Sequence, residues 1–143
     1  MPLLKNIFLA EDDKDDQFLF IDALREIDAG IRCLVANNGK ETLDKLKKIN
    51  PLPDVIFLDL NMPYMNGLEC LGKMKNDARL SKVPVVIFTT SQNPADVMAT
   101  HQLGANVFLT KPSQFSELKN KLLRILNLDF KDSMSRHLAQ YSV

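Results

Sequence analysis

Residues 55–67 read VIFLDLNMPYMNG, a short apolar run that ends on an acid and then enters a loop. A continuous apolar run of this length is typical of a strand that is buried on both faces of a parallel sheet. Asp59 follows the run directly, and Pro63 and Gly67 mark the turn that comes next. The sequence therefore predicts a lone carboxylate at the carboxyl end of a central strand.

The same alternation of apolar runs and stretches of helical period extends along the chain. It predicts five strands, at about residues 5–10, 31–36, 54–59, 84–89 and 106–110, with a helix after each. Strands that alternate with helices indicate a series of βαβ units, so the fold class is α/β with a parallel sheet.

Helix boundary signals support this division of the chain. Asn93 and Pro94 form an N-cap and first-position pair, and Gly104 marks the end of the same helix. The last predicted helix covers about residues 115–126. Residues 128–143 form a tail in which apolar residues recur every fourth position, which is consistent with either a short extra helix or a frayed end: Phe130, Met134 and Leu138.

Three other predicted strands also end in polar or charged side chains. Glu11 and Asp12 follow the first strand, Thr89 ends the fourth, and Lys111 follows the fifth. Because the carboxyl ends of parallel strands share one edge of a sheet, these residues can converge on one ligand. Carboxylates, a hydroxyl and an ammonium are suited to a divalent cation and a phosphoryl group.

Composition limits the classes of function. The length of 143 residues fits one domain, predicted here as residues 4–127, and 18 basic residues balance 18 acidic ones. No cluster of Lys and Arg suggests binding to nucleic acid or to an anionic membrane. No stretch resembles a signal peptide or approaches the ~20 residues of a membrane span. We expect a cytoplasmic protein with a small-molecule or protein partner.

The cysteines and histidines are too isolated to suggest a site. Cys33 and Cys70 lack any CxxC spacing, so both are predicted to be unpaired thiols in or near the core. His101 and His137 have no neighbouring ligand residues in the sequence and are assigned surface or packing roles.

The acids after the first strand predict a metal site. Three consecutive acids, Glu11, Asp12 and Asp13, would repel one another, and a hard cation would remove that cost. Magnesium is usually held by one or two carboxylates together with phosphate oxygens and water. We expect Asp12 and Asp59 as direct ligands and Glu11 as a ligand through water. The acids that follow are interpreted as solvated groups favoured by the helix macrodipole: Asp13, Asp15 and Asp16.

Asp59 has the chemistry of a phosphoryl acceptor. An aspartate beside a metal can attack phosphorus and form an acyl phosphate, and Lys111 can neutralise charge on the transferred oxygens. Thr89 and backbone amides after Asp59 can act as neutral donors. Pro112 follows Lys111, and a cis bond between them is a hypothesis for how the ammonium turns inward.

The order and spacing of these residues resemble a response-regulator receiver domain of the two-component systems. The matching pieces are the acid pair Glu11-Asp12, the run LDLNMP at residues 58–63 with Gly67, the strand end at Thr89, and Lys111 with Pro112. The resemblance implies a flavodoxin-like, doubly wound sheet in the order 2-1-3-4-5.

The resemblance also implies a role for each residue. Asp59 looks like the phosphoacceptor, Thr89 like the switch hydroxyl, Lys111 like the phosphate-pairing lysine and Phe108 like the aromatic that moves with the switch. Glu11 and Asp12 look like the acids that bind Mg²⁺ or Mn²⁺, with the backbone carbonyl of Asn61 as a further ligand.

The implied function is phosphorelay signal transduction. A sensor histidine kinase or phosphotransfer protein would phosphorylate Asp59, and the phosphoprotein would then dock on a downstream protein target or on a second copy of itself. Asn61 and Ser91 are predicted to set the lifetime of the acyl phosphate. A fused DNA-binding domain does not fit after residue 127, and the chain looks most like stand-alone regulators linked to phytochrome-type kinases.

Two alternatives give different predictions. A phosphatase of the haloacid dehalogenase type needs a second acid two residues after its nucleophile, but that position holds Asn61. A pseudo-receiver that binds partners without phosphorylation would be expected to lack at least one of the residues needed for phosphorylation. The acid pair Glu11-Asp12 and the residues Asp59, Thr89 and Lys111 are all present. We therefore expect no enzymatic activity beyond the chain's own phosphorylation and dephosphorylation.

Overall fold

The computed structural model describes residues 4–130 and 141–143, and its centre is a parallel sheet of five strands. The spatial order is β2-β1-β3-β4-β5, which confirms the expected order 2-1-3-4-5. The strands lie within one or two residues of the predicted ranges: β1 Asn6–Ala10, β2 Arg32–Ala36, β3 Val55–Leu58, β4 Val85–Thr89 and β5 Val107–Thr110.

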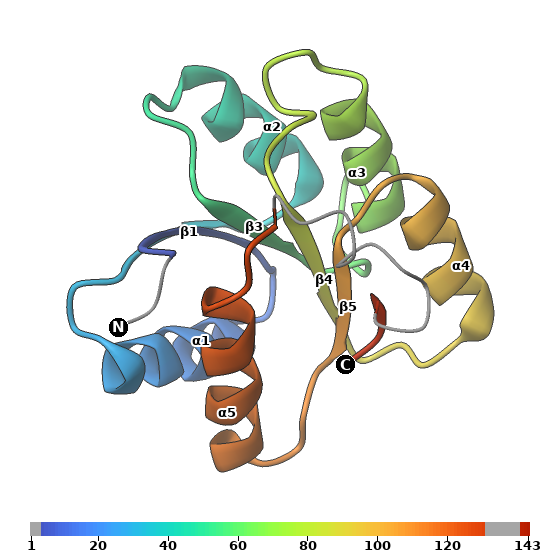
Figure 1. The fold of residues 1–143 in the computed structure, drawn as a ribbon. Coiled ribbons are helices and arrows are strands. Elements are labelled where there is room, and N and C mark those ends of the chain that lie inside the picture. Colours follow the sequence, from blue (N-terminus) through green and yellow to red (C-terminus); the bar gives the residue numbers. More distant parts are fainter. Residues whose placement is uncertain (1–3, 131–140) are drawn as a thin grey trace.

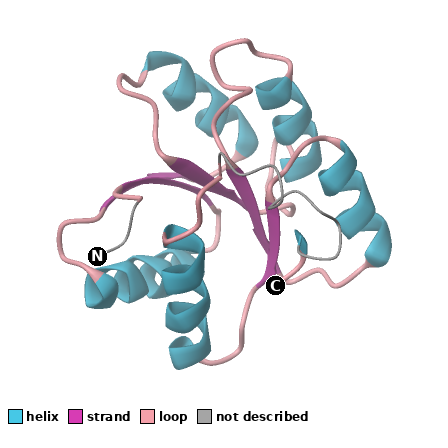
Figure 2. Cartoon of the chain, viewed as in Figure 1, coloured by secondary structure: helices cyan, strands magenta, loops and turns pink. Residues whose placement is uncertain are grey.

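A helix follows each strand, and the helices cover both faces of the sheet. Their bounds are α1 Lys14–Ile27, α2 Gly39–Lys48, α3 Gly67–Lys75, α4 Pro94–Gln102 and α5 Phe115–Leu126. α1 and α5 lie together on one face, and α2, α3 and α4 lie on the other (Figures 1 and 2). Within the described residues, no helix has the length and apolar character needed to span a membrane.

The central strand β3 explains why its sequence is a continuous apolar run. All four of its residues are buried, and successive side chains point to opposite faces of the sheet. Ile56 and Leu58 belong to the core under α2 and α3, whereas Val55 and Phe57 belong to the core under α1 and α5. Each such side chain contributes about 1.5–3 kcal/mol by burial.

Side-chain caps begin four of the helices. Asp13, Asn38 and Asn66 each accept a hydrogen bond from the backbone N–H three residues later, and Asn93 accepts one from Ala95. Each cap stabilises its helix by roughly 1 kcal/mol. The predicted cap at Asn93 is confirmed, and it orients the loop between β4 and α4.

The expected cis bond between Lys111 and Pro112 is wrong. Among the described residues the cis peptide bond joins Asn50 and Pro51, so the Lys111–Pro112 bond is trans. The trans form is the favoured one for most X-Pro bonds. The Lys111 N–H donates to the carbonyl of Thr89 at 2.7 Å, so pairing between β4 and β5 continues to Lys111 and directs it to the sheet edge without a cis bond.

The predicted tail is described only in part. Met134, His137 and Leu138 lie outside the described residues, so the expected short helix there is not tested. Phe130 packs at the margin of the core under α1 and α5. Further along, residues 141–143 return to the sheet, where Ser142 forms a parallel bridge with Phe108 in β5.

Candidate functional site

The carboxyl ends of β1, β3 and β5 bring together Glu11, Asp12, Asp59 and Lys111. Backbone pairing continues past the strands: the Glu11 N–H donates to the carbonyl of Ala36 at 2.9 Å, and the Asp59 N–H donates to that of Ala10 at 3.0 Å. Backbone hydrogen bonds between neighbouring strands therefore hold Glu11 and Asp59 in place, and both residues lie at the same edge of the sheet.

Three carboxylates form a candidate metal site at this edge. Ligand oxygens of Glu11, Asp12 and Asp59 all lie within 4.8 Å of one another. Glu11 and Asp59 are buried at 0% and 4% exposure, whereas Asp12 is exposed. Burying carboxylates so close together is costly unless a cation balances them. An all-oxygen set that is open to water on one side fits Mg²⁺ or Mn²⁺.

Lys111 is the protein's own cation in this cluster. Its Nζ lies 2.5 Å from Glu11 Oε1, 2.8 Å from Asp16 Oδ2 and 3.5 Å from Asp59 Oδ2. It also lies 5.3 Å from the ring centroid of Phe88. Burial alone would lower the pKa of Lys111, but the carboxylates of Asp16, Glu11 and Asp59 raise it overall, so the group stays charged.

Asp16 is a residue of this site that the sequence analysis missed. The interpretation of Asp16 as a solvated helix acid is wrong, because its carboxylate accepts a hydrogen bond from Lys111 Nζ. Asp13 does act as the N-cap of α1, and Asp15 is exposed. A usable signal was the spacing: a helix that begins directly after the strand-end acids carries Asp16 in its first turn, beside the same edge.

Glu11 is the most strongly perturbed acid of the cluster. The pKa of Glu11 is raised to about 7: burial raises it most, the neighbouring Lys111 lowers it, and the nearby Asp59 charge raises it. A raised pKa means that folding favours the protonated carboxyl in the absence of a cation. A bound divalent ion would favour the charged form.

Neutral donors surround the Asp59 carboxylate and the end of β4. The Asn61 backbone N–H donates to Asp59 Oδ1 at 3.3 Å, and the Ser91 N–H donates to Thr89 Oγ1 at 3.3 Å. Thr89 is fully buried at the end of β4, the strand next to β3. The Ser91 hydroxyl donates to Asp96 Oδ2 at 2.6 Å and thus ties this loop to α4.

The loop after Asp59 is tight and requires glycine at its end. A Cβ on Gly67 would lie 2.1 Å from the carbonyl oxygen of Asp59, far inside van der Waals contact. The Met65 N–H donates to the carbonyl of Pro63 at 2.7 Å around Tyr64, whose φ is 67°. This three-residue turn presses the loop against the strand end and fixes the backbone that carries Asp59.

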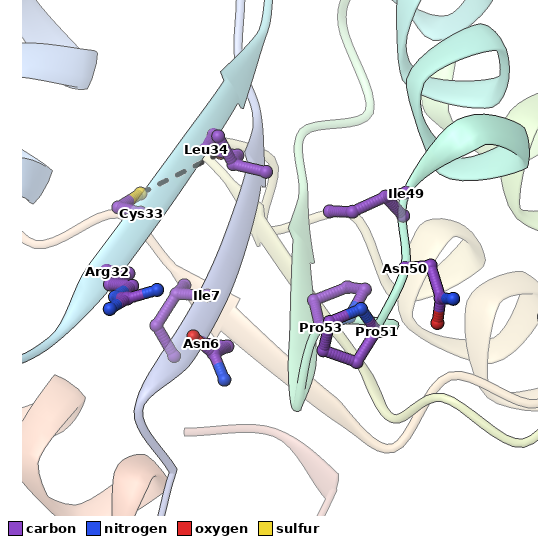
Figure 3. A pocket seen from close by; sticks show the side chains of 9 residues that line it. All are labelled: Asn6, Ile7, Arg32, Cys33, Leu34, Ile49, Asn50, Pro51 and Pro53. Carbon is purple, nitrogen blue, oxygen red and sulfur yellow. Dashed lines mark hydrogen bonds between the residues drawn. The ribbon is translucent and has the colours of Figure 1, made fainter.

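A pocket at the opposite end of the sheet lacks this chemistry. Its lining includes the first residues of β1 and β2, Asn6 and Arg32, together with Cys33 and the loop between α2 and β3 (Figure 3). No acid is among the described residues that line it, and burial raises the pKa of the Cys33 thiol to about 12. The carboxyl edge of the sheet is therefore the better candidate site.

The fold and this acid–lysine cluster define a signalling receiver module, and comparison with known proteins agrees. The model of the response regulator receiver domain matches residues 7–123, so the chain belongs to that family. The resemblance inferred from the sequence is thereby confirmed. The family is that of two-component signalling.

Individual relatives show the same similarity. The chain is 34% identical over 119 residues to the response regulator Rcp1 of Synechocystis sp., covering 80% of this chain and 81% of Rcp1. The phosphorylated cyanobacterial phytochrome response regulator RcpA matches with a TM-score of 0.78 at 33% identity, over 85% of this chain and 91% of RcpA. The Mn²⁺-bound form of Rcp1 matches with a TM-score of 0.75 at 31% identity, over 84% of this chain and 91% of that one.

The remaining residues singled out from sequence have ordinary surroundings. Cys33 and Cys70 are free thiols, as expected. His101 packs edge-on against the ring of Tyr141, with centroids 4.9 Å apart, which agrees with a packing role. Phe108 is fully buried in β5 and also contacts Tyr141.

Proposed function

We propose that residues 4–127 form a receiver that accepts a phosphoryl group on Asp59 in a Mg²⁺- or Mn²⁺-dependent reaction, in the cytoplasm. The observation that carries this proposal is the position of one buried carboxylate. Asp59 lies 3.5 Å from the Lys111 ammonium and within 4.8 Å of the oxygens of Glu11 and Asp12. The Mn²⁺-bound structure of the similar Rcp1 supports a metal at this type of site.

The reaction transfers phosphorus from nitrogen to oxygen. A carboxylate oxygen of Asp59 attacks the phosphoryl group of a phosphohistidine donor, the N–P bond breaks, and the imidazole nitrogen recovers a proton from solvent. A divalent ion held by Glu11, Asp12 and Asp59 would supply positive charge to the phosphoryl oxygens. Lys111 supplies a second positive charge, and the Asn61 amide and the Thr89 hydroxyl supply neutral donors.

The donor in this proposal is a sensor histidine kinase or a phosphotransfer protein. RcpA is described as a cyanobacterial phytochrome response regulator. Its similarity to this chain supports a phytochrome-type kinase as the donor. In that case the receiver would carry the signal from the kinase to a protein target.

The output is a change of docking surface. A backbone hydrogen bond joins Lys111, directly after β5, to Thr89 at the end of β4, and Phe108 lies in β5 three residues before Lys111. New phosphoryl contacts to Thr89 and Lys111 would shift the population between two packings of this region. The partner is a downstream protein or a second copy of the chain.

Incubation with a small-molecule phosphodonor tests the proposal. With Mg²⁺ present, intact mass should show a single added phosphoryl group, which disappears when a chelator removes the cation. The matched control is Asp59→Asn, which keeps the size of the side chain but removes the nucleophilic carboxylate. An unmodified wild-type protein, or a modified Asp59→Asn protein, would contradict the assignment. Size exclusion of the same samples reports association.

A further inference from the structure

Residues Tyr141–Val143 occupy the outer edge of β5. Ser142 pairs in parallel with Phe108, the Val143 N–H donates to the carbonyl of Phe108 at 2.8 Å, and the Thr110 N–H donates to the carbonyl of Val143 at 3.4 Å. Figure 1 shows this segment in red between β5 and α4. An edge strand otherwise presents unpaired N–H and C=O groups, so these residues satisfy part of the sheet edge.

Tyr141 anchors the segment by packing against α4 and β5. Its side chain is fully buried, and its hydroxyl lies 2.5 Å from Thr100 Oγ1. The Thr100 hydroxyl also lies 2.8 Å from the carbonyl of Asp96, to which it can donate. The ring lies edge-on to His101 and is tilted against Phe108, with centroids 6.1 Å apart in the second pair.

This arrangement has the two parts of a peptide-binding groove. Main-chain hydrogen bonds to the edge of β5 hold an extended segment, and one pocket takes an aromatic side chain with a terminal hydroxyl. Residues Tyr141–Val143, which occupy this position, show which side chains the groove accepts. Ser142 is exposed and Val143 is partly exposed, so most of the side-chain selectivity belongs to position 141.

The groove is joined to the candidate site through β5. Phe108, which touches Tyr141, pairs with Ile87 in β4, and Thr110 pairs with Thr89. Lys111 follows Thr110 and contacts the carboxylates of the site. A shift of Lys111 toward a phosphoryl group on Asp59 would therefore act on the same strand that holds Tyr141.

We propose that the groove between α4 and the edge of β5 binds an extended peptide with a tyrosine side chain, and that Tyr141–Val143 are its resident ligand. In the unmodified protein these residues keep the groove occupied. Phosphorylation of Asp59 weakens their hold through Phe108 and Thr110, so that a tyrosine-bearing strand of a partner protein can replace them. This switching step rests on the proposed function, whereas the groove itself does not.

The groove can be tested without phosphorylation. A capped peptide with the sequence of residues 139–143, Ala-Gln-Tyr-Ser-Val, is titrated into isotope-labelled full chain while the amide signals of Phe108 and Thr110 are followed by NMR. Because a tethered segment competes at an effective concentration of about 1 mM, Tyr141→Ala should bind the peptide roughly tenfold more tightly than the wild type. A peptide with alanine in place of tyrosine should not bind.

Two further variants keep this test decisive. Val143→Pro removes the N–H that donates to Phe108 but leaves Tyr141 intact, and it should also raise peptide affinity. Ser142→Ala changes an exposed side chain of the same segment and should bind like the wild type. Equal peptide affinity in the wild type, Tyr141→Ala and Val143→Pro would overturn the groove as a peptide site.

The switch is tested by repeating the titration after incubation with phosphodonor and Mg²⁺, with the modified fraction measured by intact mass. Tighter peptide binding by the modified wild type, without change in Asp59→Asn, supports the switch. Full modification with unchanged affinity overturns the switch and leaves the proposed function intact. Absence of modification overturns the proposed function and with it the switch, whereas peptide binding by unmodified Tyr141→Ala still supports the groove.

Discussion

Lys111 and Asp16 form an ion pair of 2.8 Å that joins the end of β5 to the first turn of α1. The same ammonium lies 0.7 Å farther from Asp59, at 3.5 Å, so Asp16 and Asp59 share one cation. Asp16 therefore orients Lys111 at the edge of the site and also competes for its charge.

Asp16→Asn is expected to weaken the fold slightly and to free Lys111 for Asp59. The side chain of Asp16 is 33% exposed, so the loss should be only about 1 kcal/mol in the free energy of unfolding. Urea denaturation followed by circular dichroism measures it. Asp15→Asn, one residue away on the exposed face of α1, is the matched control: it loses the same interaction with the helix macrodipole but breaks no ion pair with Lys111, so it should weaken the fold less. Equal stability of the two variants would show that the Lys111–Asp16 pair contributes nothing.

Gly67 and Gly72 lie in the same helix and should respond in opposite ways to alanine. Gly67→Ala places a Cβ 2.1 Å from the carbonyl oxygen of Asp59, so the strand end must shift, at a cost of about 1–3 kcal/mol. A Cβ on Gly72 meets no atom within 4 Å, so Gly72→Ala should stabilise α3 by about 0.5–1 kcal/mol. Thermal denaturation distinguishes them, and similar shifts in both variants would contradict this account of the loop.

Much of this architecture could be predicted because the apolar pattern and the helix caps are local signals. The run at residues 55–58 indicates a doubly buried strand, and Asn93 with Pro94 indicates the start of α4. Strand order and the role of each site residue came from resemblance to a family, since no local pattern states which strands are neighbours. The sequence predicted that Lys111 and Glu11 lie at the same edge of the sheet, but it did not predict that the two side chains are in contact.

The sequence analysis missed two contacts, each of which joins residues that are far apart in the sequence. Lys111 and Asp16 are 95 positions apart, and an acid in the first turn of a helix usually needs no partner beyond the macrodipole. The second contact is the pairing of Ser142 with Phe108 at the edge of the sheet. The sequence around Ser142 has no apolar pattern that would predict a strand. The error at Pro112 has another cause, because a Lys-Pro sequence does not specify the isomer of its bond.

Glu11 should make stability depend on pH when divalent cations are absent. Its pKa is raised from 4.5 to about 7, so between these values the folded state binds more protons than the unfolded state. The contribution of Glu11 to the free energy of unfolding is therefore fully present below pH 4.5 and is lost as the pH rises to about 7. The urea midpoint of the wild type relative to Glu11→Gln should fall over this range in a chelating buffer. Glu117→Gln, an exposed acid on α5, is the control and should show no such trend.

Asn61 and Ser91 are expected to control the lifetime of phosphorylated Asp59. The Asn61 amide donates to the Asp59 carboxylate, and the Ser91 hydroxyl is held by Asp96, so both residues lie at the loops that border the acceptor. Larger side chains at both positions should hinder the approach of water and slow dephosphorylation by about tenfold, or 1.4 kcal/mol. Decay of the phosphorylated mass over time measures the rate. A double variant that decays at the wild-type rate would remove these residues from that role.

Both cysteines should resist alkylation in the folded protein. Burial raises the pKa of Cys33 and of Cys70 to about 12, so at pH 8 both sites are strongly biased toward the neutral thiol. Both cysteines should therefore react much more slowly than an ordinary exposed thiol, because the thiolate is the nucleophile. Intact mass after iodoacetamide treatment should show no adduct in buffer and two adducts in urea. Cys33 is partly exposed and should react first as urea is raised. Rapid modification of Cys33 in buffer would mean that the edge at β2 opens far more often than its packing implies.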